Sequence, residues 1–124
     1  MPTLELLKSL ADETRLRIVN LLAEAGDMCA CEIEAVLGIN QSNASRHLSR
    51  LRSAGVLADE RQGHWVHFAL RSEHHDGRSL VHDAIALARS EMEILGRDLD
   101  RLAAYRRSGH SCESIREWAE ANAP

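Results

Sequence analysis

The 124-residue sequence has few aromatic residues, few cysteines and no excess of positive charge. Two Trp, one Tyr and one Phe are too few for the aromatic platform on which single-stranded nucleic acids stack. Three cysteines, an odd number, do not indicate a disulfide framework. No apolar run approaches the length of a membrane span, so we expect no membrane association. The length fits one domain with a single core.

Signals for secretion and for catalysis are also missing. The first five residues contain neither a basic stretch nor the start of a long apolar segment. We therefore expect a cytoplasmic protein. The sequence shows no nucleophile–base pair, no phosphate-binding loop and no paired acid–base residues, so we do not expect an enzyme.

The formal net charge of −4 is distributed unevenly along the chain. Residues 1–39 carry three Lys or Arg and seven acids, which gives −4. Residues 40–71 carry five Arg and two acids, which gives +3, and residues 72–124 carry seven Arg and ten acids, which gives −3. The positive charge is thus gathered in one segment, as in proteins that bind the DNA backbone.

The apolar spacing before and within this basic segment predicts four helices. The first covers residues 4–10, and the second follows Asp12, a typical N-cap, and ends near Gly26. A third helix is expected over 31–37, and a fourth runs from Asn40 to residues 54–55. A short helix, a glycine turn and a helix with one polar face are typical of a helix-turn-helix.

A β-hairpin is expected directly after the fourth helix. Residues 56–58 and 65–70 are the two strands, and the glycine-containing segment 59–64 is the turn. A hairpin at this place is a wing, so the fold class is a winged helix-turn-helix, mainly α with a small β-hairpin. Residues 71–77 are expected to be a linker.

The last part of the sequence predicts a long helix over 78–105 and a tail. Apolar residues along that helix are spaced alternately by four and three positions, which is typical of helix–helix packing. Because a small domain has little core left to cover this stripe, we expect it to join two copies as a homodimer. We assign residues 1–106 to the DNA-binding and dimerisation domain and 107–124 to a tail with a short helix over 113–121. The expected dimer residues are Val81, Ile85, Ala88, Met92, Leu95, Leu99 and Leu102.

Polar residues on the fourth helix and at the wing tip are the candidates for DNA contact. Asn and Gln suit adenine edges, Arg suits guanine, and basic residues of a wing suit phosphate. His47 belongs to the same helix, although a packing role suits it equally well. The candidates are Gln41, Ser42, Asn43, Ser45, Arg46, His47, Arg50, Arg61 and His64.

Two cysteines one residue apart lie in the run 27–33, which we expect to open the helix directly ahead of the recognition helix. Cys29 and Cys31 would bind a soft, thiol-seeking ion well, but buried cysteines are also common as small apolar core residues. A regular helix turns by about 100° per residue, so the two sulfurs could meet on one ion only where the helix is frayed or unwound.

Three segments resemble the ArsR/SmtB family of winged-helix metalloregulators: Leu10–Ile18, Ser45–Leu57 and Arg61–Phe68. The sequence is most similar to the arsenical-resistance repressors of that family, in which a Cys-x-Cys pair opens the third helix. The resemblance implies a dimeric repressor that binds a palindromic DNA operator and is released when As(III) or Sb(III) binds the thiolates. The zinc-sensing members of the family place acidic and His ligands along the last helix. This sequence has no counterpart of that zinc site, because His82 and Asp83 are adjacent rather than one turn apart.

The resemblance leaves the third metalloid ligand open, because Glu34 stands where the related repressors carry a third cysteine. A carboxylate is a hard donor and suits arsenic poorly. We expect Cys112 to complete the site, either within the chain or across the dimer. The alternative is a two-thiol site completed by water, hydroxide or a small thiol. A rival function is a thiol-redox switch that oxidises Cys29 with Cys31, or Cys31 with Cys112.

Overall fold

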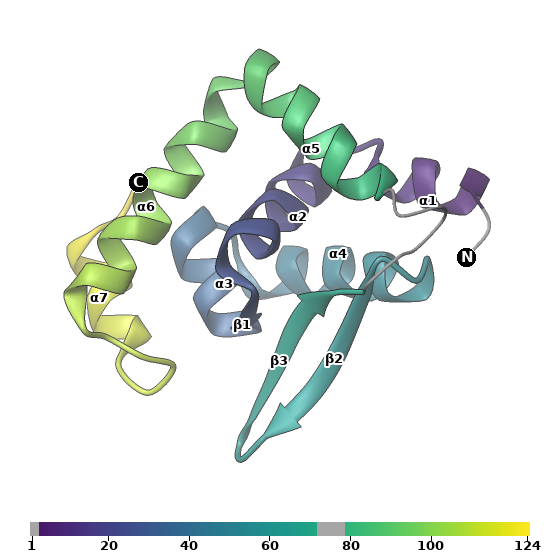
Figure 1. Ribbon diagram of the computed structural model, residues 1–124. Helices are drawn as coiled ribbons and strands as arrows, with labels where there is room; N and C mark the ends of the chain where they lie inside the picture. Colours follow the sequence, from purple (N-terminus) through teal and green to yellow (C-terminus); the bar gives the residue numbers. More distant parts are fainter. Residues whose placement is uncertain (1–2, 72–78) are drawn as a thin grey trace.

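The computed structural model describes residues 3–71 and 79–124. The predicted linker therefore lies, apart from Arg71, outside the described residues. Figure 1 shows the helices gathered around α2, with two strands projecting as a wing. The elements, in chain order, are α1 Thr3–Leu10, α2 Glu13–Ala25, β1 Asp27–Cys29, α3 Ala30–Leu37, α4 Gln41–Ser53, β2 Leu57–Gln62, β3 Trp65–Leu70, α5 Leu80–Glu91, α6 Glu93–Ser108 and α7 Ile115–Ala121.

The four predicted N-terminal helices are confirmed, including their caps. The Asp12 side chain accepts a hydrogen bond from the Arg15 amide, and that of Asn40 accepts one from the Asn43 amide. Both bonds satisfy amides that the first helical turn leaves without a partner. Gly38 ends α3 with a φ of +69°, a conformation that residues with a Cβ rarely adopt. These helices surround one core, whose fully buried side chains include Ile18, Leu21, Ile33, Val36 and Leu51.

The wing is confirmed, but its turn is shorter than predicted and its sheet is larger. β2 continues to Gln62, so the turn consists of Gly63 and His64 rather than residues 59–64. A third strand, β1, pairs antiparallel with β3 and gives the order β1-β3-β2. The prediction that the run around Cys29 opens a helix was therefore wrong for residues 27–29. Pairing with β3, in which Cys29 lies opposite His67, holds this short run extended.

The single long helix expected over 78–105 was wrong, because the chain breaks at Met92 between α5 and α6. Met92 has extended backbone angles, φ −115° and ψ 107°. The break lets both helices pack on α2, where buried Asn20 bonds to each of them. Its side chain donates to the Leu95 carbonyl over 3.2 Å and accepts from Arg89 Nε over 2.6 Å. In Figure 1 α5 and α6 form an arch over α2.

This break also explains why most of the expected dimer residues are buried within one chain. Val81, Ile85 and Ala88 on α5, and Leu95 and Leu102 on α6, are buried within the single chain. The premise that the core could not cover the stripe was wrong, since the two helices fold over α2 instead of extending past it. Met92 and Leu99 remain half-buried. Contact of this stripe with a second copy stays a prediction.

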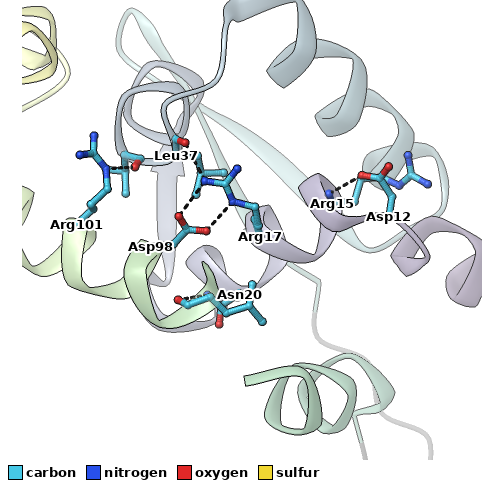
Figure 2. Close-up of polar contacts among 9 residues, drawn as sticks. Asp12, Arg15, Arg17, Asn20, Leu37, Asp98 and Arg101 are labelled. Atoms are coloured by element: carbon cyan, nitrogen blue, oxygen red, sulfur yellow. Dashed lines mark hydrogen bonds and ion pairs between the residues drawn. The ribbon is translucent and has the colours of Figure 1, made fainter. Parts of the chain in front are cut away.

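A buried ion pair joins α2, α3 and α6. Arg17 Nε and Nη2 donate to the two carboxylate oxygens of Asp98 over 2.8 and 2.9 Å. Nη2 also donates to the Leu37 carbonyl at the end of α3, as Figure 2 shows. Asp98 is only 2% exposed, and its hydrogen bond raises the pKa of Arg17. The pair fixes the last turn of α3 against α2 and α6.

Candidate functional site

Cys29 lies at a junction of two elements rather than inside a helix. It is the last residue of β1 and the N-cap of α3, with extended backbone angles. Its side chain is 1% exposed, and its Sγ lies 2.7 Å from Sγ of Cys112 in the tail. All three cysteines are free. The structure therefore brings Cys29 together with Cys112 of the same chain.

A carboxylate and a phenol complete the surroundings of these two sulfurs. The Cys29 amide donates to Glu32 Oε1 over 3.0 Å, and the Tyr105 hydroxyl donates to Glu32 Oε2 over 2.6 Å. Among the described residues, Cys29, Glu32 and Cys112 form a group whose possible ligand atoms lie within 4.8 Å of one another. Cys31 does not belong to this group, and its side chain is half-buried.

Burial controls the ionisation of the two thiols in contact. It raises the pKa of Cys29, an effect that the hydrogen bond with Cys112 reinforces. It also raises the pKa of Cys112, where the negative charge of Glu32 adds to the effect. Both side chains are therefore thiols at neutral pH. Thiols in this state react slowly, because the thiolate is the nucleophile and the metal ligand.

Arg101 on α6 holds the tail against α3. Its Nε and Nη2 donate to the carbonyls of Val36 and Ala35 over 2.6 and 3.0 Å, and its Nη1 donates to the Asn122 carbonyl over 2.7 Å. Its guanidinium carbon also lies 5.2 Å from the centre of the Trp118 ring on α7. Figure 2 shows this side chain reaching from α6 toward α3. The arrangement docks the segment that carries Cys112.

The N-terminal half of α4 presents the predicted DNA-facing side chains. Gln41, Ser42, Ser45 and Arg46 are exposed, and Asn43 is half-buried. The Arg46 guanidinium donates to the Asn43 side chain over 2.7 Å, which fixes both on the outer face of the helix. The opposite face is fully buried in the core.

Two of the predicted DNA residues on α4 have partners inside the protein. His47 is 12% exposed and lies against α2, with Nδ1 3.4 Å from Nη1 of Arg15. Burial lowers its pKa, so at neutral pH the ring is uncharged. This packing role, the alternative weighed for His47, is the one that the contacts favour. Arg50 lies 3.8 Å from Glu5 of α1 and remains partly exposed.

The wing tip carries Arg61 at the end of β2 and His64 in the turn, both exposed. Gly63 allows this tight turn with a φ of +65°. An ion pair of 3.1 Å between Arg52 and Asp59 connects α4 to the base of the wing. The two predicted DNA-contacting elements are thus linked to each other.

Sequence reasoning missed Glu32, Tyr105 and Arg101. The spacing of Glu32, three residues after Cys29, is that of a capping box and could have placed this carboxylate beside the Cys29 amide. No local pattern marks Arg101 or Tyr105, because their partners are distant in sequence.

Residues 12–59 match the family model described as bacterial regulatory protein, arsR family. The arsenical resistance operon repressor of Escherichia coli is 51% identical over 67 residues, 54% of this chain and 57% of that protein. The arsenic resistance transcriptional regulator ArsR2 of Pseudomonas putida is 48% identical over 69 residues, 56% of this chain and 60% of that protein. The matched segments thus span less than two thirds of these relatives.

Solved structures resemble the fold over a longer stretch. A transcriptional regulator HlyU from Vibrio vulnificus is 32% identical, with a TM-score of 0.58 over 71% of this chain and 84% of that one. A homodimeric winged helix-turn-helix DNA-binding domain from Mycobacterium bovis is 27% identical, with a TM-score of 0.57 over 71% of this chain and 75% of that one. Over the part of the chain that the structure describes, no helix is long and apolar enough to cross a membrane.

Proposed function

Because the chain belongs to the ArsR family of winged-helix transcriptional regulators, we propose that it is a repressor released from DNA by As(III) or Sb(III). It binds a palindromic operator as a homodimer, and cysteine thiolates bind the metalloid inducer. The contact between the sulfurs of Cys29 and Cys112 carries this proposal. It lies at the start of α3, the helix that directly precedes the recognition helix α4.

The inducer site in this proposal consists of Cys29, Cys112 and Cys31. Trivalent arsenic forms three bonds in a pyramid, and sulfur is a far better donor for it than oxygen. Cys29 and Cys112 supply two sulfurs that are already in contact. Cys31, in the first turn of α3, supplies the third when that turn moves. Glu32 stays outside the bonds and orients the Cys29 backbone.

Recruitment of Cys31 gives the mechanical cause of release. Cys31 lies outside the group of Cys29, Glu32 and Cys112, so bringing its sulfur to the metalloid displaces or unwinds the first turn of α3. Only Gly38, Ile39 and Asn40 separate α3 from α4. A shift of α3 therefore also moves α4. The two recognition helices of the dimer, which fit successive major grooves of the operator, can then no longer enter both grooves at once.

In the DNA complex, Gln41, Ser42, Asn43, Ser45 and Arg46 read base edges in the major groove. Arg50 exchanges its contact with Glu5 for a phosphate, while Arg61 and His64 bind the flanking backbone. His47 holds α4 on α2 instead of contacting a base.

The homodimer forms through an exposed apolar face of α1 and α5. Leu4 and Leu7 on α1 are 62% and 53% exposed, and Leu80 and Leu87 on α5 are 42% and 65% exposed. Large apolar side chains that a single chain leaves exposed mark interaction surfaces. α5 thus contributes one face to its own core and the other to the partner.

A thiol-redox switch is the second candidate, because the sulfur contact also favours a disulfide between Cys29 and Cys112. This pair differs from the two redox pairs expected from the sequence, which were Cys29 with Cys31 and Cys31 with Cys112. A Cys29–Cys31 bridge would be strained, since residues so close in sequence cannot take ordinary disulfide geometry.

Operator binding measured by fluorescence anisotropy, with excess phosphine reductant and added arsenite, separates the two functions. Arsenite releases the metalloid-responsive repressor under these conditions, whereas the reductant silences a redox switch. Cys29→Ser, Cys31→Ser and Cys112→Ser should each keep operator affinity and lose most of the arsenite response. Unchanged sensitivity of Cys112→Ser would show that the tail thiol is not a ligand.

A further inference from the structure

Two guanidinium groups bind the carbonyls at the end of α3. The last four carbonyls of a helix have no partner inside the helix. Arg101 of α6 donates to those of Ala35 and Val36. Arg17 of α2 donates to that of Leu37 over 2.9 Å, as Figure 2 shows. The position of the last turn of α3 is therefore set by α2 and α6.

Asp98 fixes the orientation of the Arg17 side chain. Arg17 Nε and Nη2 donate to its two carboxylate oxygens over 2.8 and 2.9 Å, and this paired geometry holds the guanidinium plane in one orientation. Asp98 is 2% exposed and the Arg17 side chain 15%, so water competes little for these bonds. Nη2 uses its second hydrogen for the Leu37 carbonyl. Asp98 thus acts on α3 through Arg17.

The bond between Arg17 and the Leu37 carbonyl favours one position of α3. Hydrogen bonds of this kind need donor–acceptor distances of about 2.7–3.2 Å, so a shift of α3 by about 1 Å away from α2 breaks the bond. α3 has eight residues, and a helix this short takes its position from the elements around it. Residues 38–40 alone connect it to α4. The bond therefore also positions the recognition helix.

We propose that Arg17 and Asp98 are positioning residues that hold α3 and α4 in the DNA-binding arrangement, and that release of DNA breaks the bond between Arg17 and the Leu37 carbonyl. The inference rests on the proposed metalloid response and names the contact against which the inducer works. A metalloid at the thiols displaces the first turn of α3, while Arg17 holds the last turn at α2. Because the bond exists in one of the two arrangements and not in the other, it raises the affinity for the operator and lowers that for the inducer.

Arg17→Lys tests this proposal, since an ammonium stays beside Asp98 but lacks the planar fork that binds the carboxylate and the carbonyl together. The arsenite concentration that releases half of the operator should fall about tenfold, which corresponds to the loss of one hydrogen bond from a charged donor. Operator affinity without arsenite should fall by that factor or less, according to how far the released arrangement becomes populated. An unchanged or higher arsenite requirement in a folded Arg17→Lys would overturn the proposal.

Two control variants separate positioning from a loss of stability. Arg106 also donates to the last carbonyl of a helix, that of Ala25 in α2, so Arg106→Lys should change neither quantity. Val19 is fully buried in the same helix as Arg17, and Val19→Ala removes part of the core. It should lower the thermal stability and leave the arsenite requirement within about twofold of wild type. A fall as large as that of Arg17→Lys would show that destabilisation alone causes the effect, and the proposal would be wrong.

Asp98→Asn tests whether Asp98 acts through Arg17. The double variant Arg17→Lys/Asp98→Asn should then have the same arsenite requirement as Arg17→Lys, whereas additive effects would overturn the role of Asp98. Hydrogen exchange of the amides of residues 38–43, without DNA or arsenite, gives an independent readout. Exchange should be faster in Arg17→Lys than in wild type and Arg106→Lys, and equal rates would contradict the proposal. If arsenite does not release wild type, the metalloid response is wrong and hydrogen exchange still decides the role of Arg17; if it does and Arg17→Lys behaves as wild type, only this inference fails.

Discussion

Replacing Arg101 by alanine tests whether α6 holds the tail, and with it Cys112, in place. The substitution removes two part-buried hydrogen bonds to α3 carbonyls, one exposed bond to the Asn122 carbonyl, and the contact with Trp118. Hydrogen bonds from charged donors contribute about 1.5–3 kcal/mol each. Of these contacts, the bond to the Asn122 carbonyl and the contact with Trp118 join Arg101 to the tail, so their loss is what weakens tail docking. Solvent screening reduces this exposed bond to about 1 kcal/mol, and the cation–π contact adds about 0.5–1 kcal/mol, which together give about 1.5–2 kcal/mol.

A loss of about 1.5–2 kcal/mol lowers the equilibrium constant for tail docking roughly ten- to thirtyfold, because each 1.4 kcal/mol is a factor of ten. Alkylation of Cys112 requires the undocked tail, so its rate follows the open population. We expect iodoacetamide to modify Cys112 up to about thirty times faster in Arg101→Ala at the same pH.

Arg106→Ala is the matched control. Arg106 also lies on α6 and donates to a backbone carbonyl, but its partner is Ala25 on α2 and not a residue of the tail. Its substitution should leave the alkylation rate of Cys112 unchanged. Arg101→Lys should resemble Arg101→Ala, since an ammonium cannot reach three carbonyls with the geometry of a guanidinium. An alkylation rate within twofold of wild type in a folded Arg101→Ala would refute this role of Arg101.

Three further predictions concern DNA, the dimer and pH. Arg46→Ala should cost about 1–3 kcal/mol of operator affinity and relax the sequence preference. Arg61→Ala should weaken binding to operator and to random DNA alike. Equal losses for Arg46→Ala on both DNAs would contradict its role in reading bases. Leu87→Glu should give monomers in sedimentation with little effect on folding, since Leu87 is 65% exposed. The control variant Arg97→Glu, on the exposed face of α6, should stay dimeric. Arsenite association should speed up with pH, up to about tenfold per unit, because the raised pKa values of Cys29 and Cys112 keep the reactive thiolates scarce. The equilibrium affinity for arsenite should stay nearly flat between about pH 6 and 8, because neutral As(OH)₃ and protonated thiols release water and no net proton. Stopped-flow experiments measure the association rate, and equilibrium titrations measure the affinity.

Features set by neighbouring residues could be predicted from the sequence. Asp12 and Asn40 mark helix starts because their side chains accept bonds from amides three residues ahead. Gly38 marks a helix end because it takes a positive φ. The helix-turn-helix and the wing follow from such local signals, and so do the exposed residues at the start of α4.

Features that depend on distant partners could not be predicted. β1 is a strand only because β3 lies beside it. The two strands are distant in sequence, since Asp27 and His67, whose side chains bond over 2.9 Å, are forty residues apart. The break at Met92 depends on Asn20, a buried polar residue of α2 that bonds on both sides of it. The apolar stripe across the break has helical spacing throughout, so periodicity alone indicates one helix. The same limit left open whether Cys112, expected at the thiol site, would reach Cys29 within the chain or across the dimer.

These distant contacts place both ends of α3 under the control of the C-terminal segment. At its N-cap, α3 meets the tail through Cys29 and Cys112, and Glu32 links this point to Tyr105 of α6. At its last turn, the carbonyls of Ala35 and Val36 bind Arg101, and a Cβ on Gly38 would lie 2.7 Å from Pro124. A ligand at the thiols therefore cannot move the tail without also acting on the turn into α4. In this chain the C-terminal segment, and not the Cys-x-Cys pair alone, connects inducer chemistry to the helix that reads DNA.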